Sequence, residues 1–239
     1  RKIGIEFLSS PFDIQSVYLL AAEFGLPRLK IASGEITNFP LLYHAARTGK
    51  RIILSTGMST LGEVETALGV LALGYAVPDE APGEEAFRRA FASKGGQDAL
   101  QKRVVLLHCT TEYPAPVGSV NLRAMDTLRE AFGLPVGYSD HTPGIAIAVA
   151  AAARGAVLIE KHLTLDRKLP GPDHQASLEP SEFAELVAAA RGTRLALGTG
   201  LKQPDPVELG NRAIARKSLV AARAIRKGEA FTEENLAVK

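Results

Sequence analysis

The chain has 239 residues, of which 46% are hydrophobic and 23% are charged. A composition of this kind supports a full hydrophobic core and excludes the disordered and fibrous classes of protein. The formal net charge is only +2 and the lysines and arginines are dispersed, so the sequence predicts no binding to nucleic acid or to an anionic membrane.

Short β-branched segments alternate along the chain with longer segments of helical period. The six expected strands are Ile3–Leu8, Leu29–Ala32, Arg51–Leu54, Val104–Cys109, Pro135–Tyr138 and Ala156–His162. The expected helix starts are Asn38 followed by Pro40, the capping box Thr60-x-x-Glu63, and Ser181 with Glu182. This alternation is typical of βαβ units that share a parallel sheet.

Two segments interrupt the alternation. Residues 78–101 are rich in proline, glycine and charge, and we expect a surface excursion there. Residues 165–177 follow the sixth strand, and we expect an active-site loop. A closed parallel barrel needs eight strands over about 250 residues. Six units within residues 1–200 therefore indicate either a barrel that lacks two units in this chain or an open sheet.

The composition changes after about Gly200. Residues 201–214 contain the sequence Pro204-Asp205-Pro206 and are expected to be a linker. Residues 215–239 contain a short strand-like run and a Lys227-Gly228 turn, which predict the start of a second small domain.

Nothing in the sequence indicates a membrane or secreted protein. No run approaches the roughly 18 apolar residues of a spanning helix, and residues 1–6 lack the layout of a signal peptide. The one cysteine, Cys109, lies in an apolar run and is expected to be a buried structural thiol. These features predict a cytoplasmic location.

Polar residues follow every expected strand at its carboxyl end, where parallel sheets and barrels gather their chemistry. Ser33, Ser55 and Ser139 follow three different strands, and a glycine comes soon after the first two. Hydroxyls with exposed backbone N–H groups form anion pockets, and Lys30 adds a positive charge. Serine and glycine are also ordinary turn residues, but their repetition beside a strand lysine predicts a phosphate or carboxylate site.

Two histidines follow consecutive strands. Neighbouring strands lie about 5 Å apart, so the imidazoles of His141 and His162 are near enough to bind one divalent ion, although structural roles for both remain open. His108 is expected in the core and His44 on a helix surface. Asp173 lies in the 165–177 loop, where it either contacts a polyhydroxylated substrate or serves as a turn residue.

Taken together and in order, six segments resemble the sialic acid synthase family. They are Lys30–Glu35, Leu54–Met58, His108–Thr110 together with Tyr113-Pro114, Tyr138–Thr142, Glu160–His162 and Gly171–His174. Residues 215–229 resemble the start of the antifreeze-protein-like domain that follows the barrel in that family. The resemblance implies an α/β fold, a (β/α)8 barrel without its first two βα units, over residues 1–200.

The resemblance also implies a site. Lys30, Ser33, Ser55 and Ser139 would bind phosphoenolpyruvate, with Thr111 at a position where the family sometimes has an asparagine. The remaining implied roles are a divalent ion, Mn²⁺ or Mg²⁺, for His141 and His162, sugar contacts for Tyr113 and Asp173, and a place near the reacting centre for Glu35, which joins Lys30 as a catalytic residue. A glutamate and a lysine on the family's first two strands have no counterpart in this chain.

The implied activity is that of a transferase of the N-acetylneuraminate synthase type. It would condense phosphoenolpyruvate with an N-acetylated amino sugar and release phosphate by cleaving a C–O bond. N-acetylmannosamine is the first expected sugar, and its 6-deoxy diacetamido relative is the alternative. The partner would be a second copy of the chain in a homodimer with swapped lids. Two other interpretations stay open: an aldolase in which Lys30 forms a Schiff base with pyruvate, and a non-catalytic sugar-binding protein.

Overall fold

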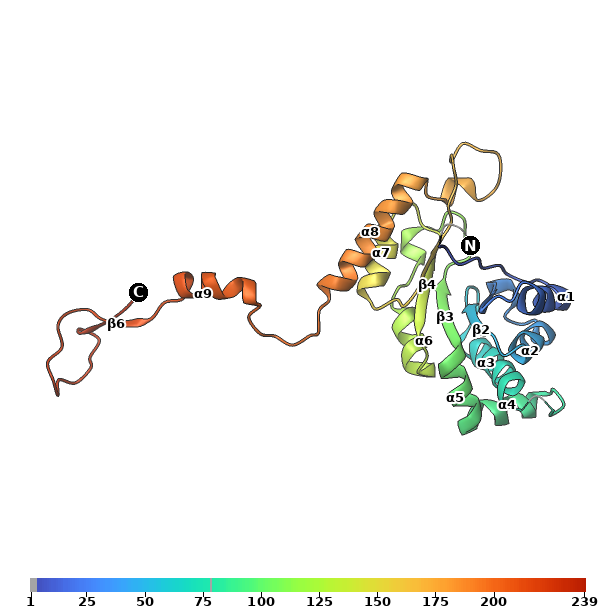
Figure 1. Cartoon of the computed structure of the whole chain (residues 1–239), viewed down its shortest axis with the longest axis horizontal. Coiled ribbons are helices and arrows are strands. Elements are labelled where there is room, and N and C mark those ends of the chain that lie inside the picture. Colours follow the sequence, from blue (N-terminus) through green and yellow to red (C-terminus); the bar gives the residue numbers. More distant parts are fainter. Residues whose placement is uncertain (1–3, 78) are drawn as a thin grey trace. The chain divides into compact units, whose positions relative to one another are not determined.

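The computed structural model describes residues 4–77 and 79–239. These residues form two compact units, the first ending at Leu197 and the second spanning Gly198–Lys239. The first unit is an α/β fold whose parallel strands and helices follow one another along the chain, as Figure 1 shows.

Five parallel strands form the sheet of the first unit, each paired with the next along the chain. They are β1 Arg28–Ile31, β2 Arg51–Ser55, β3 Val104–Cys109, β4 Val136–Asp140 and β5 Ile159–Lys161. Residues that alternate along these strands point to opposite faces of the sheet. On β1, Leu29 and Ile31 lie in the hydrophobic core, so Lys30 points to the other face.

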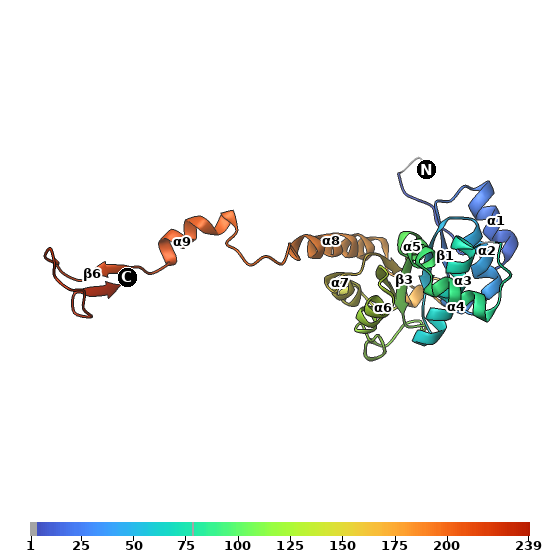
Figure 2. The ribbon, with the colours of Figure 1, turned by 90° about the horizontal axis from the view of Figure 1, so that it is seen from below.

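Helices cover the core face of the sheet. They are α1 Ile14–Tyr18, continued by the π-helical turn η1 Leu19–Glu23, α2 Phe39–Arg47, α3 Leu61–Ala76, α4 Glu84–Ala92, α5 Lys94–Arg103, α6 Ala124–Phe132, α7 Ala146–Ala153 and α8 Pro180–Ala196. Three short 3₁₀ turns lie in the connections, η2 Ser33–Glu35, η3 Val117–Ser119 and η4 His174–Ala176. The turned view in Figure 2 shows these helices packed around the sheet.

Two of the three expected helix starts are confirmed. The Asn38 side chain accepts a hydrogen bond from the Leu41 backbone and opens α2. Thr60 and Glu63 form the complete capping box of α3. The third expectation is wrong by two residues, because Glu179 caps α8 and its box partner is Glu182, which leaves Ser181 inside the helix.

The first expected strand, Ile3–Leu8, is wrong over the residues that the structure describes; Ile3 lies outside them. Residues 4–8 have no strand pairing. A single backbone hydrogen bond, from Lys30 N to the Ser9 carbonyl, connects the following residues to β1. Ile5 and Phe7 are 69% and 61% exposed, so no packed partner favours an extended ladder here.

The expected surface excursion at residues 78–101 is also wrong, apart from Pro78, which lies outside the described residues. The segment forms α4 and most of α5, and Phe87 and Leu100 are buried in the core. Its many charges occupy the outer side of α4, where Arg89 pairs with Glu85 one turn away. The expected loop at residues 165–177 is confirmed as a loop that contains η4.

The second unit is small. It contains η5 Pro206–Glu208, α9 Leu209–Ala215 and an antiparallel pair of strands, β6 Leu219–Ala221 and β7 Leu236–Val238. Asn235 is 1% exposed and ties the turn between the strands through hydrogen bonds with Thr232 N and the Ala230 carbonyl. Leu219 and Phe231 nevertheless remain largely exposed.

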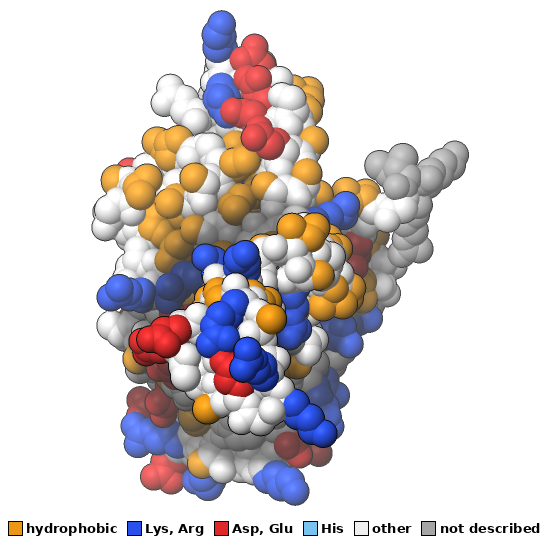
Figure 3. Space-filling model, turned by 90° about the vertical axis from the view of Figure 1, so that its left-hand side faces the viewer, with side chains coloured by type: hydrophobic (Ala, Val, Ile, Leu, Met, Phe, Trp, Pro, Cys, Tyr) orange, Lys and Arg blue, Asp and Glu red, His pale blue; other side chains and the backbone are white. Residues whose placement is uncertain are grey.

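The surface carries charges of both signs. Figure 3 shows acidic and basic side chains mixed with hydrophobic ones over the face that it displays. Among the helices of the described residues, none is both long enough and apolar enough to cross a membrane.

Candidate active site

The inner face of the sheet, opposite the helices, carries a buried lysine. Lys30 is 8% exposed, and its Nζ donates a hydrogen bond of 2.7 Å to Ser55 Oγ on the next strand. A second bond of 3.3 Å goes to the Ile31 carbonyl. A buried ammonium needs such partners, because desolvation without them is costly. The hydrogen bond thus brings together Lys30 and Ser55, which were both predicted to bind an anion.

Glu160 on β5 completes this inner-face cluster. Its Oε1 accepts a 2.6 Å hydrogen bond from Ser139 Oγ and lies 3.6 Å from Lys30 Nζ. The sequence pattern alone assigns Glu160 no role in the site, although it belongs to the segment Glu160–His162. The available signal was the register, since Ser139 lies directly opposite Glu160 in the pairing of β4 and β5.

The contact between Lys30 and Glu160 also measures the curvature of the sheet. Lys30 lies on the first strand and Glu160 on the last, and four strand spacings in a flat sheet would separate them by about 19 Å. Two side chains cannot bridge that distance to 3.6 Å. The five strands therefore curve around the inner face as part of a barrel does.

A polar cradle surrounds Gly57, just beyond the end of β2. Gly57 N donates to Ser33 Oγ at 3.1 Å, and the Cys109 Sγ atom lies 3.1 Å from the same hydroxyl. A Cβ at position 57 would come within 2.3 Å of Thr111 Oγ1 and 2.8 Å of both Cys109 Sγ and Ser33 Oγ. Thr111 Oγ1 is buried without a hydrogen-bond partner.

This cradle fits a small anion that would satisfy the unpaired hydroxyl. It also revises the expectation for Cys109, which is buried as predicted but contacts a predicted binding residue instead of serving only as packing.

The two strand-end histidines lie side by side. The ring centroids of His141 and His162 are 5.4 Å apart, and the Tyr113 ring lies 4.2 Å from the first and 5.5 Å from the second. His141 Nδ1 donates to the Thr110 carbonyl at 2.8 Å, since a carbonyl only accepts. The proton therefore resides on Nδ1 and the Nε2 lone pair is free, with Ser139 Oγ 3.5 Å away.

The chemistry of this histidine pair suits a divalent ion. Burial lowers the pKa of His141, and the nearby His162 lowers it further, so the imidazole is held in the neutral form that binds metals. No group of three or more His, Cys, Asp or Glu side chains suited to a metal is present in residues 4–77 and 79–239. The protein would supply two nitrogen ligands and leave positions open for water and substrate.

The remaining predicted residues lie at different distances from this centre. Asp173 Oδ2 is 3.9 Å from His162 Nδ1, so the 165–177 loop does bring its aspartate to the histidines. Burial raises the pKa of Tyr113, whose hydroxyl stays protonated as a hydrogen-bond donor. Glu35 instead accepts a 2.7 Å hydrogen bond from Asn38 Nδ2, which ties it to the start of α2.

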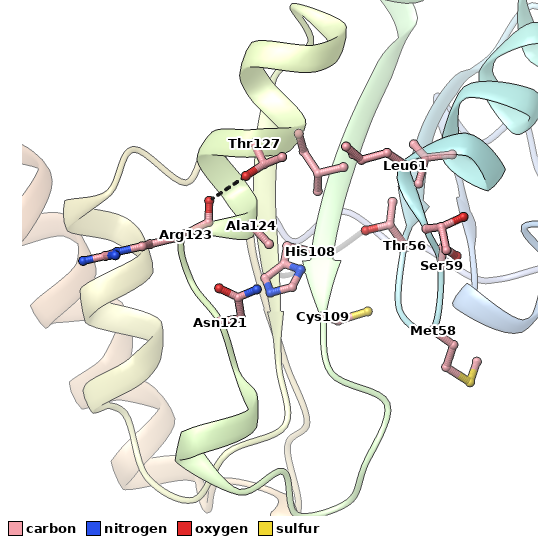
Figure 4. A pocket seen from close by; sticks show the side chains of 13 residues that line it. Thr56, Met58, Ser59, Leu61, His108, Cys109, Asn121, Arg123, Ala124 and Thr127 are labelled. Atoms are coloured by element: carbon pink, nitrogen blue, oxygen red, sulfur yellow. Dashed lines mark hydrogen bonds between the residues drawn. The ribbon is translucent and has the colours of Figure 1, made fainter.

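A separate pocket of about 370 Å³ lies on the helix side of the sheet, where the loop after β2 and the start of α3 face α6 (Figure 4). His108 forms part of its wall, and its Nε2 donates to the Val120 carbonyl at 2.7 Å. The side chain is half-buried instead of fully inside the core. His44, expected on a helix surface, accepts or donates one hydrogen bond with the Tyr18 hydroxyl at 2.8 Å.

Comparison with known proteins identifies the family. The NeuB family profile matches residues 1–202. The chain belongs to the NeuB family. A solved structure of N-acetylneuraminic acid (sialic acid) synthetase from Leptospira borgpetersenii, in complex with citrate, is 36% identical with a TM-score of 0.71. The match covers 89% of this chain and 65% of the synthetase chain. A truncated 3-deoxy-D-arabino-heptulosonate 7-phosphate synthase from Thermotoga maritima, with 20% identity, a TM-score of 0.59 and coverage of 84% and 70%, shares the fold.

Several curated relatives of this chain carry the name of a synthase. The N,N'-diacetyllegionaminic acid synthase of Campylobacter jejuni is 51% identical over all of this chain and 64% of its own length, and that of Legionella pneumophila is 44% identical over 99% and 60%. Human N-acetylneuraminate-9-phosphate synthase is 35% identical over 100% and 59%. This chain thus spans about three fifths of the length of these relatives.

Proposed function

We propose that the intact protein condenses phosphoenolpyruvate with an open-chain N-acetylated amino sugar to give a nonulosonic acid and phosphate. The observation that carries this proposal is the inner-face cluster beside the histidine pair. Lys30 contacts Ser55 and Glu160, and Glu160 in turn binds Ser139, which lies next to His141. The synthase names of the relatives support it independently.

Phosphoenolpyruvate would bind by its two anionic groups to the inner face. Lys30 Nζ and the hydroxyls of Ser55 and Ser139 supply a charge and donors on one side, and the cradle of Ser33 and Thr111 supplies hydroxyls on the other. Lys30, Ser55 and Ser139 are held in place by the sheet before substrate arrives, so they stabilise charge on the departing phosphate without reorganising. Fixing both substrates in one cavity removes much of the entropic cost of their reaction.

The histidine pair would hold a divalent ion, Mn²⁺ or Mg²⁺. A neutral His141 whose Nε2 is free, next to the His162 ring, provides the donor set. When bound, such an ion supplies Lewis acidity toward a carbonyl oxygen. Tyr113 and Asp173, which lie against the histidines, would hold the sugar with its aldehyde toward the inner face. Glu35 would act near the reacting centre after exchanging its Asn38 contact.

The proposed reaction balances as follows. The C3 carbon of phosphoenolpyruvate forms a bond to the aldehyde carbon of the sugar, whose oxygen gains a proton. Water adds at C2 and loses a proton. The C2–O bond to phosphate then breaks, phosphate leaves with the bonding electrons and takes up the proton of the C2 hydroxyl, and C2 becomes the ketone carbon. Lys30 and the site hydroxyls hold the phosphate throughout.

The proposed organisation has three parts: a barrel domain over residues 1–200, a linker over 201–214 and the start of an antifreeze-protein-like domain over 215–239. The proposed location is cytoplasmic. We also propose a homodimer in which this small domain covers the partner's site. Exposed apolar side chains of the second unit, such as Ile214 and Phe231, favour such an interface. Dilution in an analytical ultracentrifuge tests it, and an intact protein that stays monomeric and active would rule it out.

We propose the diacetamido sugar as the preferred substrate. The two N,N'-diacetyllegionaminic acid synthases are 51% and 44% identical to this chain, whereas human N-acetylneuraminate-9-phosphate synthase is 35% identical to it. N-acetylmannosamine is the second choice.

A coupled phosphate-release assay on the intact protein, with N-acetylmannosamine, the diacetamido precursor of legionaminic acid and the precursor of pseudaminic acid, tests the proposal. We expect turnover with one of the first two sugars. Release of phosphate with none of them would overturn the proposed function. Borohydride treatment with pyruvate is the companion test, because a covalent adduct on Lys30 would identify a Schiff-base aldolase instead.

A further inference from the structure

Two buried charges directly precede the two histidines. Asp140 comes before His141 at the end of β4, and Lys161 comes before His162 at the end of β5. Strand alternation points both charges away from the inner face, toward the helices. Asp140 is fully buried, the Lys161 side chain is 1% exposed, and Lys161 Nζ lies 2.8 Å from Asp140 Oδ2.

The hydrogen bonds of this pair involve the residues directly before and after His141 in the sequence. Asp140 Oδ1 accepts from Thr142 N at 2.9 Å and from Thr142 Oγ1 at 2.8 Å. Lys161 Nζ also donates to the Thr142 carbonyl. The residues on either side of His141 are thus tied to each other and to the residue before His162.

The same pair fixes the two strands against each other. Asp140 lies opposite Lys161 in the register of β4 and β5. The ion pair therefore locks the last residue pair of the ladder, immediately before the chain passes to the histidines. The His141 ring itself has the Thr110 carbonyl and the Ser139 hydroxyl as hydrogen-bond partners, so the ion pair acts on the ring through the backbone beside it.

The energetics indicate a role beyond stability. Burying two charges costs desolvation free energy, and a hydrophobic pair of similar size is often as stable. The ion pair contributes to orientation instead, because its hydrogen bonds hold the backbone on both sides of His141, whose ring must face the metal. Replacing a group that orients a metal ligand typically changes metal affinity by about 10–100-fold.

We propose that Asp140 and Lys161 are positioning residues that hold the His141 and His162 rings at the separation needed to share one divalent ion. This inference rests on the proposed function, in which the two histidines are the ligands. It assigns no contact with substrate to either residue of the pair.

The test uses the intact protein in metal-free form. Mn²⁺ affinity is measured from the electron paramagnetic resonance signal of free Mn²⁺, and phosphoenolpyruvate affinity is measured separately by calorimetry without metal. The variants are Asp140→Asn, Lys161→Met and the double variant. Val136→Ala is the matched control, because Val136 is a fully buried residue on the same strand and the same face, far from the histidines.

Each single variant is expected to weaken Mn²⁺ binding by about 10–100-fold while phosphoenolpyruvate affinity is unchanged within error. Val136→Ala should lower the melting temperature and leave Mn²⁺ affinity at the wild-type value. The double variant removes the unpaired charge that each single variant leaves, so it should regain stability without regaining Mn²⁺ affinity. Thr142→Val keeps the ion pair and serves if the single variants do not fold; it should show a smaller loss in the same direction.

Folded variants that bind Mn²⁺ as wild type does would overturn the proposal. So would a loss of both affinities in proportion to lost stability, because that pattern indicates structural support alone. His141→Gln separates this inference from the proposed function. If His141→Gln keeps its Mn²⁺ affinity, the ligand assignment fails; if it loses that affinity while Asp140→Asn does not, the positioning role alone is rejected.

Discussion

Lys30 is a buried cation whose side-chain partners lie on other strands. Ser55 and Glu160 satisfy it from two directions. A lysine in such a place is stabilised by its neighbours. Its position on the inner face could be predicted from alternation with Leu29 and Ile31 alone. Its contact with Glu160 could not, because that contact depends on the curvature of the whole sheet.

Replacing Lys30 with methionine should lower the affinity for phosphoenolpyruvate by about 10–100-fold, since a hydrogen bond to a charged group contributes about 1.5–3 kcal/mol. The methionine side chain keeps most of the apolar volume of the lysine stem. Calorimetric titration of the intact protein measures the change. Lys102→Met, at an exposed position next to the start of β3, is the control and should bind as wild type does. Equal affinity in the two variants would remove Lys30 from the anion site.

His108 makes the stability of the first unit sensitive to acid. Burial lowers its pKa below the unfolded value of about 6.5, so the unfolded chain binds more protons than the folded one as pH falls through that value. The free energy of unfolding should therefore decrease from pH 7.5 to pH 5.5. His108→Gln keeps a donor for the Val120 carbonyl but cannot titrate, so its decrease should be smaller in urea titrations. His141 shifts in the same direction and accounts for part of the remainder. A decrease as large in the variant as in wild type contradicts this assignment.

At the scale of elements, the strand ends decide which side chains meet. β4 and β5 bring Ser139 against Glu160 on the inner face and Asp140 against Lys161 on the helix face. The pairing register of β4 and β5 thus determines both the Ser139–Glu160 contact of the inner-face cluster and the ion pair beside the histidines. A shift of one residue would exchange the two faces.

Gly137 permits this register. A Cβ at position 137 would lie 2.4 Å from the Leu158 carbonyl and 2.6 Å from Leu107 Cδ2, so Gly137→Ala should destabilise the first unit by about 1–3 kcal/mol. Gly192→Ala is the contrasting variant, because nothing lies within 4 Å of its Cβ inside α8, and it should stabilise by about 0.5–1 kcal/mol. Chemical denaturation of both variants gives the two signs. A Gly137→Ala variant as stable as wild type would mean that β4 and β5 pair less closely than described.

Much of the sheet could be predicted from the sequence, because β-branched runs with polar ends mark β1 to β5 to within a few residues. Two segments were interpreted wrongly for identifiable reasons. Ile5 and Phe7 alternate as a strand does, but alternation without a partner forms no ladder. The charges and glycines of residues 84–103 obscured two helices whose apolar sides are short, with Phe87 and Leu100 as their buried anchors. The Gly57 cradle was only partly predictable, since its serine and glycine are visible in sequence and the approach of Cys109 is not.

At the scale of the whole molecule, the five-stranded sheet has two free edges among the described residues. β1 pairs with β2 alone and β5 with β4 alone. Apolar side chains near the first edge, among them Phe7, Phe12 and Phe24, are more than half exposed. Free strand edges and exposed apolar surface promote association with other chains.

A polypeptide of these 239 residues should therefore aggregate, whereas a longer polypeptide in which both sheet edges are paired should not. Size-exclusion chromatography with light scattering, at several concentrations, measures the difference. A monodisperse product of this length that unfolds cooperatively would show that the curved sheet is self-sufficient, contrary to this expectation.

The 3.6 Å contact between Lys30 and Glu160 joins the first strand of the sheet to the last. The inner-face cluster consequently cannot form in a partly folded chain, because the first strand alone lacks Glu160 and the last strand alone lacks Lys30. Ligand occupancy then reports on the completeness of folding, and a ligand that binds there stabilises all five strands together. Under heat or denaturant, bound phosphoenolpyruvate should protect the backbone amides of β1 and β5 from hydrogen exchange to the same extent, although these strands are far apart in the sequence.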